Sequence, residues 1–197
     1  LSGNSNCLCN IDNKLIESEF QQVLLGVSID SNLIFNDNIN DICKKASQKL
    51  NALARISCYM DIEKRRTIMK AFITSQFGYC PLIWMFHSRG LNNKINSIHE
   101  RALRITYGCK DLTFSELLKK DKSVSIHHRN LQVLAIEMFK IYTHNAPHIL
   151  KDVFELRSPV YNLRNERHFQ RRKVCSVYNG TESLSFLGSK NLGFSAF

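Results

Sequence analysis

The feature that most constrains the fold is a change in hydrophobic period near residue 37. Before it, residues 14–16 and 23–30 form short runs of Leu, Ile and Val bounded by polar turn residues, a pattern that predicts a buried pair of strands. After it, apolar residues recur every three or four positions, which predicts an amphipathic helix with lysines on its opposite face. Asn36 or Asp37 is the expected cap of this helix.

Four further helical segments follow. The first begins at Asp61 and is interrupted by Gly78 and Pro81, so residues 82–86 are expected to form a separate turn or short helix. The others span about 92–107, ending at Gly108; 113–120, with a capping box from Thr113 to Glu116; and about 125–142. A last turn is expected at 149–154. The sequence thus predicts a mostly α fold, a helical bundle with a short N-terminal β element.

The predicted domain organisation has three parts. Residues 1–36 form the β element, residues 37–157 the helical domain, and residues 158–197 a basic, irregular tail, because that last stretch is rich in Asn, Arg, Ser and Gly and shows no sustained period. The chain begins with Leu1 rather than Met, and we expect it to be a piece of a longer reading frame.

The net positive charge of the chain indicates which class of partner it binds. The chain of 197 residues carries 27 Lys and Arg against 17 Asp and Glu, a net charge of +10. Residues 41–110 hold 13 of the basic residues and only 4 acidic ones. Because a basic surface concentrates polyanions whatever fold lies beneath it, nucleic acid is the expected partner.

The sequence gives little support for catalysis. Two-metal phosphoryl transfer needs carboxylates brought to one place, yet no Asp-Asp pair occurs, and turn and cap roles suffice for Asp30 and Asp37. Gly26 stands alone in a predicted strand rather than in a phosphate-binding loop. A nucleophile and histidine that converge only in the folded chain remain possible, so an intact hydrolase is a third alternative.

Neither a metal nor a cofactor is expected in this chain. Cys7 and Cys9 are separated by one residue, and Pro147 interrupts the helix that would align His144 with His148. The seven cysteines are odd in number and follow no signal-like apolar run, which favours a reduced intracellular protein, nuclear or cytoplasmic. No apolar run approaches the roughly 20 residues that span a bilayer, so no membrane partner is expected.

The basic residues are the candidate functional groups. Cations on helices can contact phosphates without reading sequence, although surface helices are also often Lys-rich for solubility alone. In the tail, aromatic residues alternate with a further set of arginines and could stack on unpaired bases. The residues that we expect to contact nucleic acid are Lys44, Lys45, Lys49, Lys64, Arg65, Arg66, Lys70, Arg101 and Arg104. We expect Tyr79 and Trp84 to lie in the core instead.

Several short segments, which occur in the same order along the chain, resemble those of one protein family. They are residues 24–30 (LLGVSID), 43–56 (CKKASQKLNALARI), 75–85 (SQFGYCPLIWM), 99–104 (HERALR), 126–132 (IHHRNLQ), 161–164 (YNLR) and 178–184 (YNGTESL). Together they are similar to the end of the palm, the thumb and the region downstream in jockey-like non-LTR retrotransposon reverse transcriptases. The resemblance covers roughly residues 20 to 188, and after residue 188 the sequence departs from the family's pattern.

The resemblance implies an RNA-directed DNA polymerase fragment that holds RNA, DNA or their hybrid behind the active site. It implies that Leu25, Gly26 and Val27 lie near a primer grip, and that the fingers and palm, with the catalytic aspartates and their Mg²⁺, lie upstream as the partners of this region. The alternative is a decayed or repurposed fragment that acts as a protein-interaction module without a catalytic role.

Overall fold

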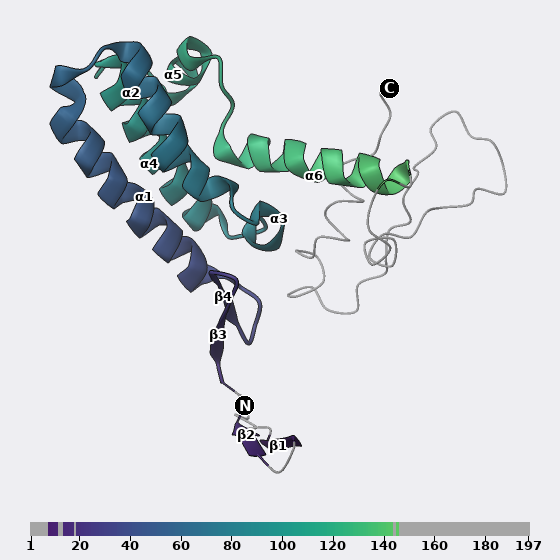
Figure 1. The fold of residues 1–197 in the computed structure, drawn as a ribbon. Helices are drawn as coiled ribbons and strands as arrows, with labels where there is room; N and C mark the ends of the chain where they lie inside the picture. The colour runs from purple at the N-terminus through teal and green to yellow at the C-terminus, as the bar shows by residue number, and fades with distance from the viewer. Residues whose placement is uncertain (1–7, 12–13, 18, 144, 146–197) are drawn as a thin grey trace, which may run out of the picture.

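The computed structural model describes residues 8–11, 14–17, 19–143 and 145 (Figure 1). The described part is mostly helical with short N-terminal β structure, as predicted. Two antiparallel hairpins come first: β1 (Leu8–Ile11) with β2 (Lys14–Glu17), and β3 (Gln21–Leu24) with β4 (Val27–Asp30). The helical elements are α1 (Asn36–Ile56), η1 (Ser57–Tyr59), α2 (Ile62–Ile68), η2 (Met69–Ile73), η3 (Thr74–Gly78), α3 (Pro81–Trp84), α4 (Arg89–Tyr107), α5 (Phe114–Asp121) and α6 (Ile126–Tyr142).

The two long helices α1 and α4 pack side by side and form the centre of the bundle (Figure 1). The β3–β4 hairpin lies at the N-terminal end of α1, while α2 and α5 lie towards its other end. Helix α6 contacts α3, α4 and η3 and extends beyond them (Figure 1). In the described part of the chain, no helix is both long and apolar enough to cross a membrane.

The core follows the period that the sequence predicts. One face of α1 is buried, and α4 buries its own apolar stripe against it. Trp84 is fully buried, as predicted, whereas the prediction for Tyr79 is wrong because 52% of its surface is exposed. The largest buried side chains of the core are Ile39, Leu50, Leu53, Met69, Ile73, Phe77, Trp84, Ile95, Leu103 and Leu117.

The prediction of a buried strand over residues 23–30 is wrong. The segment folds back on itself, with Leu24 opposite Val27 and a two-residue turn at Leu25 and Gly26. Both turn residues have positive φ, 50° and 82°, the conformation that matches the twist of a tight hairpin. Gly26 therefore serves the turn rather than a strand, and all four residues of β3 are exposed.

The predicted cap of α1 is also wrong. Phe35 occupies the cap position in a left-handed conformation, and its side chain makes no capping bond. The carboxylate of Asp30 instead accepts hydrogen bonds from the backbone N–H groups of Asn32, Ile34 and Phe35, at 3.0, 3.0 and 2.6 Å. Asp30 therefore has the turn role expected of it and orders the connection from β4 into α1.

The other helix ends agree better with the sequence. Asp61 caps α2 by accepting from Lys64 N, Gly108 ends α4 with φ 65°, and Thr113 forms the predicted capping box with Glu116. Helix α4 begins three residues earlier than predicted because Ser88 supplies its cap. The tail at 158–197, the turn at 149–154, His144 and His148 lie outside the described residues.

Candidate nucleic-acid interface

The three predicted lysines of α1 lie on two sides of the helix. Asn40, Lys44 and Asn51 are spaced by four and seven residues, so they share the side that flanks α4. Lys45 and Lys49 are one turn apart and share the other side, where Lys45 lines a cleft. The three lysines therefore do not form one cluster, and the expectation of a single lysine face opposite the core is corrected.

Two cations of α4 extend across to α1. Lys94 Nζ donates to Asn40 Oδ1 at 2.7 Å, and Arg101 Nη2 donates to Asn51 Oδ1 at 3.0 Å. Lys44 is exposed on the same side of α1. We name these three side chains, Lys44, Lys94 and Arg101, the α1–α4 basic face. Neutral amides hold Lys94 and Arg101, and none of the ion pairs found among the described residues includes Lys44, Lys94 or Arg101, so carboxylates do not cancel their positive charge there.

The predicted primer-grip residues lie at the tip of the β3–β4 hairpin. Leu25 is exposed, whereas Val27 is buried beneath the turn. Tyr79 Oη donates to the carbonyl of Leu25, and the indole N–H of Trp84 donates to the carbonyl of Tyr79 at 2.9 Å. These bonds attach the hairpin tip to η3 and α3, beside the cleft that Lys45 lines.

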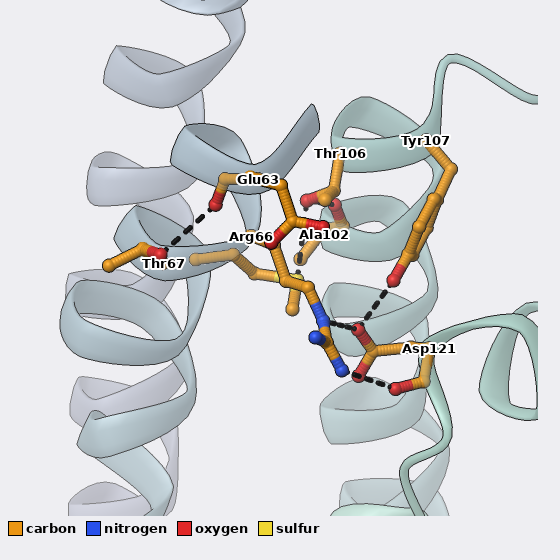
Figure 2. A network of polar contacts seen from close by, with 8 residues as sticks. Glu63, Arg66, Thr67, Ala102, Thr106, Tyr107 and Asp121 are labelled. Carbon is orange, nitrogen blue, oxygen red and sulfur yellow. Dashed lines mark hydrogen bonds and ion pairs between the residues drawn. The ribbon is translucent and has the colours of Figure 1, made fainter. Parts of the chain in front are cut away.

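Arg65 and Arg66 make internal contacts rather than projecting freely. Arg65 donates to the carbonyls of Met60 and Thr106, at 2.9 and 3.3 Å. Arg66 donates through Nε to Asp121 Oδ1 and through Nη2 to the Asp121 carbonyl, both at 2.7 Å (Figure 2). Both arginines thus join α2 to α4 and α5.

Asp121 is the centre of a network that also includes Tyr107 (Figure 2). Its side chain is 1% exposed, and Tyr107 Oη donates to the same carboxylate oxygen at 2.6 Å. Burial acts to raise the pKa of Asp121, but the hydrogen bonds from Tyr107 and Arg66 lower it below the usual value. Burial, followed by the bond to Asp121 and its charge, raises the pKa of Tyr107 to about 12. This network stabilises the bundle.

The remaining predicted cations occupy separate places. Arg104 forms an ion pair with Glu100 at 2.6 Å and donates to the carbonyl of Lys110. Lys64 pairs with its own helix cap, Asp61, at 3.2 Å. Lys70 is exposed in η2. The structure therefore brings only Arg101 together with Lys44, and adds Lys94 to them.

Lys94 was absent from the predicted set, although the sequence held a signal for it. It lies seven residues before Arg101, a separation that returns a side chain to the same face of a helix. Here, helical spacing identifies the exposed cations better than clustering along the sequence.

Among the described residues, no group of three or more His, Cys, Asp or Glu side chains is placed to hold a metal ion. His99 is buried, and burial lowers its pKa to about 4, so its ring is neutral at pH 7. No family model, no curated protein and no solved structure matches the chain.

Proposed function

We propose that the helical domain binds the sugar–phosphate backbone of a nucleic acid across the α1–α4 basic face. In this proposal the chain is the thumb-like part of a reverse transcriptase, and it holds the template–primer duplex for a catalytic palm encoded upstream. Backbone binding needs cations within reach of phosphates and no base readout. The observation that carries the proposal is that asparagines of α1, instead of carboxylates, accept from Lys94 and Arg101, on the side of α1 that also carries Lys44.

The exposed apolar residues of the β3–β4 hairpin support the polymerase part of the proposal. Val23, Leu24 and Leu25 are 67%, 61% and 82% exposed, which is unusual for adjacent large apolar side chains in a finished protein surface. Within the part of the chain that the structure describes, the outer edge of β3 is also unpaired in its two-stranded sheet. A palm sheet packed on this hairpin would cover both.

The same hairpin favours a second candidate, a protein-interaction module without a nucleic-acid role. An open strand edge with apolar side chains can pair with a strand of another protein. The two candidates differ in their dependence on salt, since a phosphate contact releases counterions and an apolar contact does not.

The test is binding of a short RNA–DNA hybrid at two salt concentrations, followed by fluorescence anisotropy. With three phosphate contacts, affinity should fall by roughly 40-fold between about 50 mM and about 200 mM salt. The variant Lys44→Glu with Lys94→Glu should bind more weakly at low salt and show a much flatter salt dependence.

The matched control is Lys110→Glu with Lys119→Glu, which changes the same charge at exposed positions outside this face. It should bind the hybrid nearly as well as the unmodified chain. If both double variants lost the same affinity for the hybrid, net charge alone would explain the loss. That result would overturn the proposal. Binding whose affinity does not change with salt concentration would favour the protein-interaction module.

A further inference from the structure

Tyr59 is the most exposed of the large apolar residues in the described part of the chain, at 86%. It lies in η1, the short helical turn that follows α1. Within the described residues, its side chain makes neither a hydrogen bond nor a contact with another ring or a cation. The ring of Tyr59 therefore adds little to the stability of the fold and is open to a ligand.

Two more apolar side chains are exposed at the ends of the helices that flank this turn. Ile56 ends α1 and Ile62 begins α2, and each is 45% exposed. A single exposed apolar residue is normal on a protein surface, whereas several in one region mark a binding site. The turn lies at the end of α1 that is away from the β3–β4 hairpin (Figure 1). This end of the bundle therefore offers an apolar surface that the fold itself does not use.

A stripe of polar and basic residues on α1 leads to this turn. Lys44, Asn51 and Arg55 follow one another at spacings of seven and four residues, so they share one side of the helix. All three are exposed, and Arg55 takes part in none of the ion pairs found among the described residues. Arg55 therefore continues the side of α1 that carries Lys44, and Tyr59 follows four residues later.

The length of this stripe matches a stretch of nucleic-acid backbone. From Lys44 to Arg55 it extends about 16 Å, because a helix rises about 1.5 Å per residue. Each strand of a duplex carries one phosphate per roughly 3.4 Å of its axis. A strand that lies along this side of α1 thus presents several phosphates before it reaches the turn at Tyr59.

An exposed aromatic ring beyond a row of cations suits an unpaired base. The bases inside a duplex stack on one another, whereas an unpaired base exposes its π-face to an aromatic side chain. Arg55 is the cation that precedes the ring and can contact the phosphate of the same nucleotide. Asp61 is the nearest acid along the chain, but it caps α2 and pairs with Lys64, so its charge is partly compensated.

We propose that Tyr59 stacks on the first unpaired base of a strand that leaves the duplex held by the α1–α4 basic face. The inference rests on the proposed function and defines its ligand more closely, as a duplex with a single-stranded extension. Stacking on an aromatic ring accepts any base, so the extension is bound without a sequence preference.

The test compares a blunt RNA–DNA hybrid with the same hybrid carrying a short unpaired extension, by fluorescence anisotropy on the full chain. The extension should raise the affinity about tenfold, because stacking of one base on an aromatic side chain contributes on that order. With 2-aminopurine as the first unpaired base, binding should also quench the fluorescence of that base, which reports stacking directly.

Three variants separate stacking from other contacts. Tyr59→Phe keeps the ring and should keep both the gain in affinity and the quenching. Tyr59→Leu keeps an apolar side chain without a ring and should lose both, while its affinity for the blunt hybrid stays unchanged. The matched control is Phe72→Leu, which removes an aromatic ring that is 56% exposed in η2, and it should behave as the unmodified chain.

A gain and quenching that survive Tyr59→Leu would overturn the inference, as would an extension that adds no affinity to the unmodified chain. Because Tyr59 is so exposed, its variants should unfold at the same temperature as the unmodified chain, which separates lost binding from lost folding. Salt-dependent binding of the blunt hybrid without a gain from the extension overturns the stacking alone. A gain from the extension that is unchanged in Lys44→Glu with Lys94→Glu overturns the proposed function alone.

Discussion

His99 shows how burial sets the charge of a single residue. Its ring is 4% exposed and packs edge-on against Phe114, with ring centroids 5.6 Å apart. Its Nδ1 has no partner. Burial is the main cause of its low pKa; the charge of Asp121 acts to raise the pKa, and the charge of Arg129 acts to lower it. The neutral ring is therefore part of the folded core.

This burial makes stability depend on pH. The pKa of His99 is about 4 in the folded chain against 6.5 ordinarily, so between these values the unfolded chain binds more protons. Stability should therefore fall as pH decreases from 6.5 to 4, by about 3 kcal/mol from this residue. Urea unfolding at several pH values measures it. His99→Leu should remove most of the slope, and an unchanged slope would contradict the assignment.

Among the helices, the sequence predicted correctly those ends that are capped by a side chain a few residues away. The caps at Asp61 and Thr113 act within three residues, so their spacing alone identified them. The start of α1 depends on Asp30, which bonds backbone groups up to five residues away from within the preceding hairpin. The sequence assigned Asp30 a turn role, but its pattern does not show that this carboxylate, rather than a cap at Asn36 or Asp37, orders the start of α1.

Removing this carboxylate should weaken the entry into α1. Asp30→Ala leaves three backbone donors without their acceptor and should lower the free energy of unfolding by about 1 to 2 kcal/mol, as lost caps do. Asp37→Ala removes the acid that the sequence suggested as the cap and should cost less than about 0.5 kcal/mol. Chemical denaturation compares the two. A larger loss for Asp37→Ala would show that Asp37 stabilises the helix start.

Arg65 and Arg66 show why the partners of single cations could not be predicted from the sequence. Their position in a run of cations suggested solvent and phosphate, yet their partners are Thr106 and Asp121, 41 and 55 residues away. Hydrophobic period reveals which face of a helix is buried, but not which cation finds a distant acceptor. For Lys44 and Lys94, by contrast, the helical spacing of the sequence is enough to place the side chain on an exposed helix face.

For the whole molecule, burial predicts a gradient of local stability. Helices α1 and α4 each bury six residues, while β3 buries none. Backbone amides at the centres of α1 and α4 should exchange with solvent slowest, and those of β3 near the rate of an unfolded chain. Hydrogen–deuterium exchange followed by mass spectrometry tests this order. Protection of β3 equal to that of α1 would mean that the hairpin is covered in solution.

The two hydrogen bonds from Trp84 to Tyr79 and from Tyr79 to Leu25 form a mechanical linkage. The indole is anchored in the core, and the phenol reaches from the surface to the hairpin tip. The side chain and backbone carbonyl of Tyr79 therefore connect the exposed hairpin tip to the buried indole of Trp84. A partner bound at Leu25 would therefore be two hydrogen bonds away from Trp84 in the core.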